Sequence, residues 1–356
     1  MIPLLFALVV AFAPQGEEQG PAPVSLDGLP FPPHGRMATQ AEQGRPDDPV
    51  LAEFEGAPVE RFQREWTPGG FLRVRRYVER DAQRRDIDHG PDWRWYENGQ
   101  VQLKRTWRHG RQDGPFIDYW ESGFVKSSGV FVRDDKDGRW LGWHEDGAPK
   151  AEKTWKLGRL DGVEREWFRT GVQRIHITWK DGVLDGPYRV WYGTGRQSVD
   201  GRYSAGVKDG PWTEWGEDGG IATTGTYSHG LEDGRFYRRD GSTHEQYEET
   251  LVLGVLEGPR TVFDSQGRKV TAGSYSKNRP IGLHTTWYPS GAVRSEIEYV
   301  DGVATGPAKY FHENGRLQGE GNLTAGKREG AWRYFDADGA PDAAATGVYH
   351  DDAKVP

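Results

Sequence analysis

The sequence predicts an all-β fold, an elongated array of 24-residue β-hairpin repeats that forms one long antiparallel sheet or open solenoid. Three observations lead to this prediction. Glycine recurs every 24 residues without a break, further glycine columns share that period, and aromatic residues occupy fixed positions between them. The segments between the glycines favour Trp, Tyr, Val and Thr, which suit β-strands.

Three columns define the repeat. The main glycine column consists of Gly90, Gly114, Gly138, Gly162, Gly186, Gly210, Gly234, Gly258, Gly282, Gly306 and Gly330. Five residues after each of these come Trp95, Tyr119, Trp143, Trp167, Trp191, Trp215, Arg239, Phe263, Trp287, Phe311 and Phe335, aromatic in all but one repeat. A second aromatic column holds Trp107, Phe131, Trp155, Trp179, Tyr203, Tyr227, Tyr275 and Tyr299, with Leu251 and Leu323 completing it.

Two turn positions in each repeat divide it into two strands. One holds glycine nine residues after the main column, as in Glu97-Asn98-Gly99, and we predict a three-residue loop with glycine in the left-handed bulge position. The other is the Gly110 column, where Asp134 and Asn278 replace glycine, which indicates positive φ. The three-residue loop predicts both aromatic columns on one face, whereas a two-residue Asn-Gly turn would place them on opposite faces.

A lone hairpin is marginal in water, so the units must stack edge to edge. About twenty-two strands, spaced about 4.8 Å apart, would give a length on the order of 100 Å. A degenerate unit starting at Arg61 is predicted to cap the N-terminal end, and the last residues, from Gly347, fray or cap the other. The unit from Gly234 to Gly254 is irregular, with its turn expected two residues early at Gly241.

The chain ends give a domain plan. Residues 1–13, MIPLLFALVVAFA, form an apolar run too short to span a bilayer, and the run ends in a small-x-small pattern. We therefore predict a signal peptide, the alternative being a buried strand. Residues 14–60, rich in Pro, Gly and acidic residues, form a flexible linker, residues 61–350 the repeat array of about 11 repeats plus the cap, and residues 351–356 a tail. The expected location is extracytoplasmic, periplasmic or secreted, in a bacterium.

Composition and spacing argue against several kinds of chemistry. The net charge of −8 disfavours nucleic acid, and the absence of Cys excludes disulfides and thiolate metal sites. The histidines show no metal-ligand spacing, and no two carboxylates stand out as a catalytic pair. The Asp of Asp-Gly starts, as at Asp137 and Asp209, is expected to accept backbone hydrogen bonds rather than bind calcium. We expect no enzyme activity, catalytic residue, metal or cofactor.

The repeats resemble the MORN repeat in the variant form found in many bacterial proteins. The resemblance depends on Trp-Tyr-Glu-Asn-Gly at 95–99, on the Asp-Gly-Pro starts at Asp113 and Asp209, and on the aromatic-x-x-Gly turns at 203–206 and 227–230. It covers about 61–350 and implies a hairpin array without enzyme activity. Some proteins with this variant are labelled antitoxin-like, and other MORN arrays act as scaffolds. The membrane role of some MORN proteins transfers poorly, because this array is acidic.

The candidate binding residues come from two places in the array. Trp143, Trp167, Trp191 and Trp215 fall in consecutive units and would form a ladder, either as the core of the sheet or as a platform for a sugar or peptide. His244 and Glu248 fall in the irregular unit, where the alternatives are drift and a specificity loop.

Three functional hypotheses follow from this reading. The first is an exported, non-enzymatic scaffold that binds a protein partner. The second is a cell-surface module that binds a cell-wall glycan, and the third is an antitoxin or immunity-type protein that binds one toxin. None of the three requires nucleic acid or membrane insertion of the mature chain.

Overall fold

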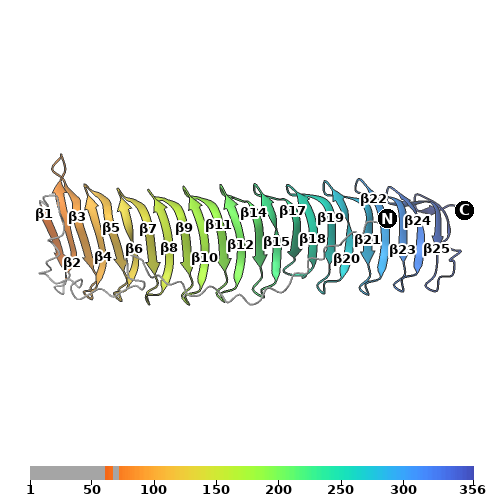
Figure 1. Cartoon of the computed structure of the whole chain (residues 1–356), viewed down its shortest axis with the longest axis horizontal. Coiled ribbons are helices and arrows are strands. Elements are labelled where there is room, and N and C mark those ends of the chain that lie inside the picture. The colour runs from red at the N-terminus through yellow and green to blue at the C-terminus, as the bar shows by residue number, and fades with distance from the viewer. Residues whose placement is uncertain (1–60, 67–71) are drawn as a thin grey trace, which may run out of the picture.

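The computed structural model describes residues 61–66 and 72–356, and within these ranges the chain is all-β with no helix. Figure 1 shows a long, single-layered sheet whose strands follow one another from β1 at one end to the last strands near the C-terminus. The predicted fold class is confirmed. The predicted signal peptide (1–13) and linker (14–60) lie outside the described residues.

In chain order the strands are β1 (Arg61–Trp66), β2 (Leu72–Arg80), β3 (Asp86–Trp95), β4 (Val101–Arg108), β5 (Arg111–Tyr119), β6 (Val125–Val132), β7 (Asp135–Trp143), β8 (Pro149–Lys156), β9 (Arg159–Trp167), β10 (Gln173–Lys180), β11 (Val183–Trp191), β12 (Gln197–Ser204), β13 (Val207–Lys208), β14 (Gly210–Trp215), β15 (Ile221–Ser228), β16 (Leu231–Glu232), β17 (Gly234–Arg239), β18 (Gln246–Val252), β19 (Val255–Phe263), β20 (Lys269–Ser276), β21 (Arg279–Trp287), β22 (Val293–Val300), β23 (Val303–Phe311), β24 (Leu317–Thr324), β25 (Lys327–Tyr334), β26 (Gly347–His350) and β27 (Ala353–Lys354).

Strands pair with their chain neighbours, and every pairing is antiparallel. At two places a strand is divided, so that β13 and β14 both lie beside β12, and β16 and β17 both lie beside β15. The strands β1 and β2 form a hairpin at the position of the predicted N-terminal cap. At the other end β26 pairs with β25, and Tyr349 is buried against Trp332. Between described residues no pairing joins the first strand to the last, so the sheet is open.

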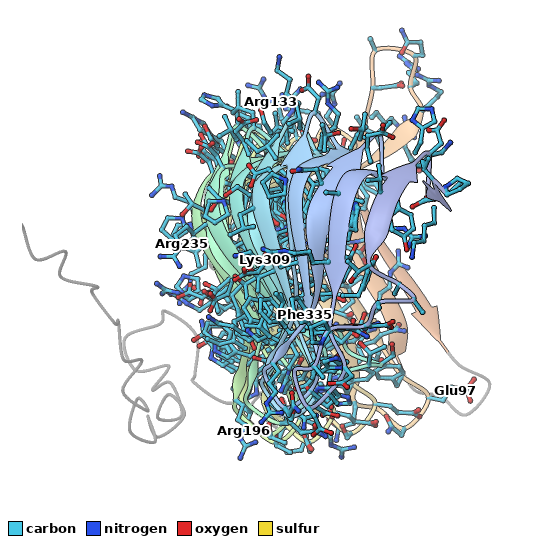
Figure 2. All side chains as sticks on the ribbon, turned by 90° about the vertical axis from the view of Figure 1, so that its right-hand side faces the viewer. Glu97, Arg133, Arg196, Arg235, Lys309 and Phe335 are labelled. Carbon is cyan, nitrogen blue, oxygen red and sulfur yellow. The ribbon has the colours of Figure 1, made fainter. Side chains whose placement is uncertain are left out.

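The predicted loop chemistry is confirmed at both edges of the sheet. In the first hairpin loop the Tyr96 N–H donates to Gln100 O at 2.8 Å, the Gly99 N–H donates to Tyr96 O at 3.0 Å, and Gly99 has a φ of 84°. At the other edge the two-residue turns have positive φ at both positions, as at His109 (50°) and Gly110 (80°). In Figure 2, Arg133 marks this turn edge at the top, and Glu97 and Arg196 mark the loop edge at the bottom.

The prediction that both aromatic columns share one face is wrong. Gly90 lies opposite Trp107 and Arg94 opposite Leu103, but Trp95 lies opposite Val101. This shift leaves Gln102 as an extra residue in β4, a β-bulge that reverses the side-chain alternation. Accordingly the Trp107 indole N–H donates to Asp92 Oδ2 at 3.2 Å, on the face away from Trp95. We call the two sides of the sheet the Trp95 face and the Trp107 face.

On the Trp107 face, aromatic rings lie on glycines of the preceding strand. A Cβ added to Gly201 would lie 2.0 Å from the Trp212 ring, and one added to Gly225 would lie 2.3 Å from Phe236. The same arrangement recurs at Gly129 with Trp140, Gly273 with His284 and Gly321 with Trp332. The Trp212 ring also stacks on Tyr188 at 5.7 Å and meets Tyr203 edge-on at 5.5 Å. Glycine therefore lets each ring rest on backbone and reach the rings beside it.

On the Trp95 face, a buried cluster lies near the N-terminal end of the array. It comprises Trp95, Val101, Tyr119, Val125, Leu141 and Trp143. At the C-terminal end a buried cluster lies on the Trp107 face and comprises Ala308, Leu323, Trp332 and Tyr349. Burial in this sheet thus comes from side chains that neighbour one another on the same face.

The irregular unit does not turn early, which corrects that expectation. Gly234 lies opposite Leu251, the same offset as Gly90 and Trp107, and β17 pairs with β18 without a register shift. The Asp240 N–H donates to Glu245 O at 2.8 Å, closing a four-residue loop, 241–244. This loop is one residue longer than the loops of the other units, and the strand after it lacks their one-residue bulge. The two differences cancel, so the period of 24 residues is kept.

We predict that Gly201→Ala destabilises the protein by about 1–3 kcal/mol, because the new methyl group displaces the Trp212 ring. Denaturant unfolding, followed by tryptophan fluorescence, measures the change. Gly142→Ala is the control, since a Cβ there meets nothing closer than 3.8 Å. Equal stability of the two variants would contradict the packing described for Trp212.

A second prediction concerns Tyr227, which lies among the rings of the Trp107 face. Burial, together with the Glu232 carboxylate that accepts its hydroxyl hydrogen bond at 3.2 Å, raises the pKa of Tyr227 to about 12. The unfolded chain loses this proton near pH 10. The free energy of unfolding should therefore fall as the pH rises from about 10 to about 12, because the folded state alone retains the proton. Tyr227→Phe should flatten this fall in thermal midpoints measured across alkaline pH, and an unchanged slope would refute the assignment.

Candidate interaction surface on the Trp95 face

Two parallel rows of side chains run along the Trp95 face. The first row contains the predicted tryptophan ladder, with Trp143, Trp167, Trp191 and Trp215 on β7, β9, β11 and β14. Their cross-strand partners are Pro149, Gln173, Gln197 and Ile221. The four tryptophans therefore lie in one row and alternate there with these residues. Trp143 and Trp167 are only 3% and 6% exposed, whereas Trp191 and Trp215 are half-buried and present part of each ring to solvent.

The second row lies beside the first and changes its chemistry along the array. It begins with Trp93, Lys104, Ile117, Ser128 and Leu141, so apolar side chains alternate there with one cation and one hydroxyl. It then becomes charged through Glu152, Arg165, His176, Arg189 and Asp200, each directly opposite the next across a strand pair. It continues through Thr213 and Thr224, whose hydroxyls are hydrogen-bonded at 2.9 Å. Sequence analysis missed this row. Its members are the residues that lie 3 and 14 positions after each glycine of the main column, so the sequence does contain a signal for it.

The carboxylate of Glu152 is the most buried charge of this row, at 6% residue exposure. The Arg139 Nε donates to one of its oxygens at 2.5 Å, and an Arg165 guanidinium nitrogen donates to the other at 3.0 Å. Further along, the Arg189 Nε donates to Asp200 Oδ1 at 3.1 Å in a more exposed pair. Arg165 and Arg189 are therefore each hydrogen-bonded to a carboxylate on the strand that lies farther from β10.

His176 lies between these two arginines. It faces Arg165 on β9 and Arg189 on β11, one on each side of β10. Partial burial, followed by the positive charges of Arg165 and Arg189, lowers the pKa of His176, and Glu152 opposes this effect. The imidazole is consequently neutral near pH 7. The centre of the row thus combines two cations with one uncharged ring.

The other predicted residues, His244 and Glu248, occupy different places. His244 lies in the exposed loop 241–244 with a φ of 60°, and its backbone N–H donates to Asp240 O at 3.0 Å. Glu248 lies exposed in the second row, opposite Tyr237 and Thr261. Among the described residues no hydrogen bond or ion pair joins the two side chains.

Hydrogen bonds between successive hairpins fix both edges of the array. At the loop edge, hydroxyls of Tyr96 and Tyr192 donate to the backbone oxygens of Tyr119 and Trp215 at 2.8 and 2.7 Å. His312, in the same column, makes the matching contact to Phe335 O at 2.9 Å. At the turn edge, Asp137 accepts from the Leu157 N–H at 3.0 Å. Asp209 and Asp233 accept equivalent bonds from His229 and Leu253, which confirms the role expected for the Asp-Gly carboxylates.

Among the described residues, no three His, Asp or Glu side chains gather closely enough to hold a metal ion. A search of the same residues for a helix of membrane-spanning length and hydropathy finds none.

An open pocket of about 190 Å³ lies near the C-terminal end of the Trp95 face, lined by Pro307, Ala308, Lys309, Glu320, Gly321, Asn322, Ala331 and Arg333. In Figure 2, the labels of Lys309 and Phe335 mark this end of the array.

We predict that Glu152→Gln destabilises the protein more than Asp200→Asn does. The first change leaves two guanidinium groups without their buried carboxylate and should cost about 1–3 kcal/mol. The second breaks an exposed pair and should cost less than about 1 kcal/mol. Denaturant unfolding of both variants gives the comparison. A larger loss for Asp200→Asn would show that Glu152 is not the electrostatic anchor of the row.

Solved structures with a detectable likeness include a Photorhabdus luminescens Tc holotoxin pore carrying a TccC3 D651A mutation. It is 9% identical, covers 82% of this chain and 15% of that chain, and has a TM-score of 0.16. A TcdB2-TccC3-TEV crystal structure gives 10% identity, 82% and 17% coverage, and a TM-score of 0.14. This chain therefore spans less than a fifth of those chains, and scores this low support no inference about function. None of the curated proteins matches.

The family comparison agrees with the repeat analysis. The model described as "MORN repeat variant" matches residues 280–301 and 304–324. Each match spans one hairpin, β21–β22 and then β23–β24. The same period, loop and turn conformations continue through the neighbouring hairpins of the sheet. The chain thus carries adjacent repeats of the MORN repeat variant family, within one array of hairpins.

Proposed function

We propose that this protein is a non-enzymatic scaffold that binds another protein along the Trp95 face and works outside the cytoplasm. The observation that carries the proposal is the second row. Its backbone geometry repeats from hairpin to hairpin, while its side chains change along the array. Apolar residues alternate with Lys104 and Ser128 at the start, charged residues follow from Glu152 to Asp200, and the paired hydroxyls of Thr213 and Thr224 come next. A stiff array whose surface chemistry varies along its length suits recognition of an extended partner.

The dimensions of the sheet fit such a role. Strands lie about 4.8 Å apart, and six residues of a strand extend about 20 Å. Four hairpins therefore offer a surface of about 40 by 20 Å, close to the roughly 800 Å² that one partner contributes to a standard interface. The array is long enough to hold such a patch several times over.

Bonds between hairpins support the same proposal, because a scaffold must keep its surface in one conformation. Side chains of one loop donate to the backbone of the next, and glycine-anchored rings pack across strands on the other face. A partner that binds this face meets a surface that is already ordered, which lowers the entropic cost of association.

The extracytoplasmic part of the proposal depends on the apolar N-terminal segment, residues 1–13. Sequencing the N-terminus of the protein purified from its native host, with fractionation of the same cells, tests it. We expect a mature N-terminus near residue 14 in the extracytoplasmic fraction. An intact Met1 in a purely cytosolic protein would rule out export.

Partner capture tests the scaffold itself. The full-length protein should retain a specific protein from native extract, and a charge reversal on the Trp95 face should abolish that retention. Three variants sample the beginning, middle and end of the face: Lys104→Glu, Arg189→Glu and Lys309→Glu. Lys277→Glu, in a turn at the sheet edge, is the control and should retain the partner. Retention that is equal for all four variants would place the partner elsewhere and contradict the proposal.

A further inference from the structure

The charged stretch in the middle of the second row departs from the alternation of charge that the row shows near its C-terminal end. Near the C-terminal end, Glu296, Lys309, Glu320 and Arg333 lie opposite one another in turn, so the sign of the charge alternates from strand to strand. Opposite charges in such cross-strand pairs are mutually stabilising. In the middle of the array the order is Glu152, Arg165, His176, Arg189 and Asp200. A neutral imidazole stands where alternation calls for a carboxylate.

Unused hydrogen-bond donors surround this position. Arg165 and Arg189 each carry five N–H donors. Their hydrogen bonds to Glu152 and Asp200 point away from His176 and use one nitrogen of each guanidinium. The His176 ring has no hydrogen-bond partner among the described residues. The side chains of Arg165 and Arg189 are 33% and 44% exposed, so a ligand can reach both of them.

The surroundings indicate what kind of anion fits. In the first row beside this site, the half-buried Trp191 offers an apolar edge, and the amide of Gln173 already donates to Ile175 O. The three paired arginines of this row, Arg165, Arg189 and Arg333, all have carboxylates as partners. A single carboxylate on a protein segment meets these conditions, because it completes the alternation and brings apolar neighbours to Trp191.

We propose that Arg165, His176 and Arg189 form a docking site for an Asp or Glu side chain in an extended acidic segment of the partner protein. This inference rests on the proposed scaffold function and names the chemistry of its partner. The incoming carboxylate lies above His176 and accepts charge-assisted hydrogen bonds from the guanidinium groups on either side. The residue next to it in the partner packs on the exposed part of Trp191.

The test uses the full-length protein and blocked hexaglutamate as the probe, at low ionic strength, where charge interactions are least screened. Nuclear magnetic resonance of the histidine ring protons reports binding. We expect the His176 signals to shift with saturation, while those of the exposed turn residue His229 stay unchanged. Arg189→Gln should weaken binding about tenfold, since a charge-assisted hydrogen bond is lost. Lys309→Gln removes a cation from the unbroken part of the row and should bind the probe as the wild type does.

Replacing the imidazole itself gives the sharpest variant. His176→Glu supplies the missing carboxylate from within the chain, so it should abolish probe binding while the thermal midpoint stays level or rises. His176→Gln leaves the site open and should still bind. Binding of hexaglutamate by His176→Glu at the wild-type level would overturn the proposal. So would a larger shift of the His176 signals with inorganic phosphate than with hexaglutamate at equal concentration.

Partner capture distinguishes a failure of the carboxylate docking site from a failure of the proposed scaffold function. If the wild-type protein and His176→Glu retain the same partner equally well, the docking site is wrong and the scaffold stands. If no partner is retained by either protein, the scaffold fails, and probe binding alone decides whether the carboxylate site exists. Loss of the partner in His176→Glu with retention in His176→Gln supports both.

Discussion

A hairpin in this array has no second layer within the described residues to bury its rings, so its stability depends on contact with the hairpins on either side. The constraint explains why aromatic residues dominate the repeat. Rings are wide enough to reach across a strand spacing of about 4.8 Å and touch the next ring on the same face. Trp212, packed on Gly201 and between Tyr188 and Tyr203, shows the arrangement. Units held by such contacts gain stability from their neighbours, as in other repeat proteins.

The same constraint accounts for the turns and for the stiffness that a binding surface needs. Each hairpin must keep the same register along the strand direction as the hairpin before it, because the rings would otherwise not meet. Hydrogen bonds at the two edges fix this register: the Tyr192 hydroxyl donates to the backbone oxygen of Trp215, and Asp137 accepts from the backbone N–H of Leu157. The irregular unit respects it too, because its longer loop takes up the residue that the strand bulge releases. The second row can therefore vary in chemistry while its backbone stays in register.

Periodicity made most of the architecture predictable, since the glycine columns specify both the repeat length and the backbone conformations of loop and turn. The faces could not be predicted, because the bulge at Gln102 has no residue signature, and one extra residue inverts a strand. The contacts between rings and glycines could have been predicted from the sequence, because Gly201 and Gly225 each precede an aromatic residue by 11 positions. For the site, the sequence placed the four tryptophans in one row but could not show that Trp143 and Trp167 are buried. The pairing of His176 with two arginines required the register.

Small-angle X-ray scattering of the full-length protein tests the central claim, that hairpins stacked side by side form an open array without a second layer. A rod on the order of 100 Å long has a radius of gyration of roughly 30 Å. Its pair-distance distribution should decline almost linearly to the longest distances, with a thin cross-section. A compact chain of this length would give about 20 Å and a symmetric distribution. That second result would show that the hairpins fold back on one another, and it would contradict the account.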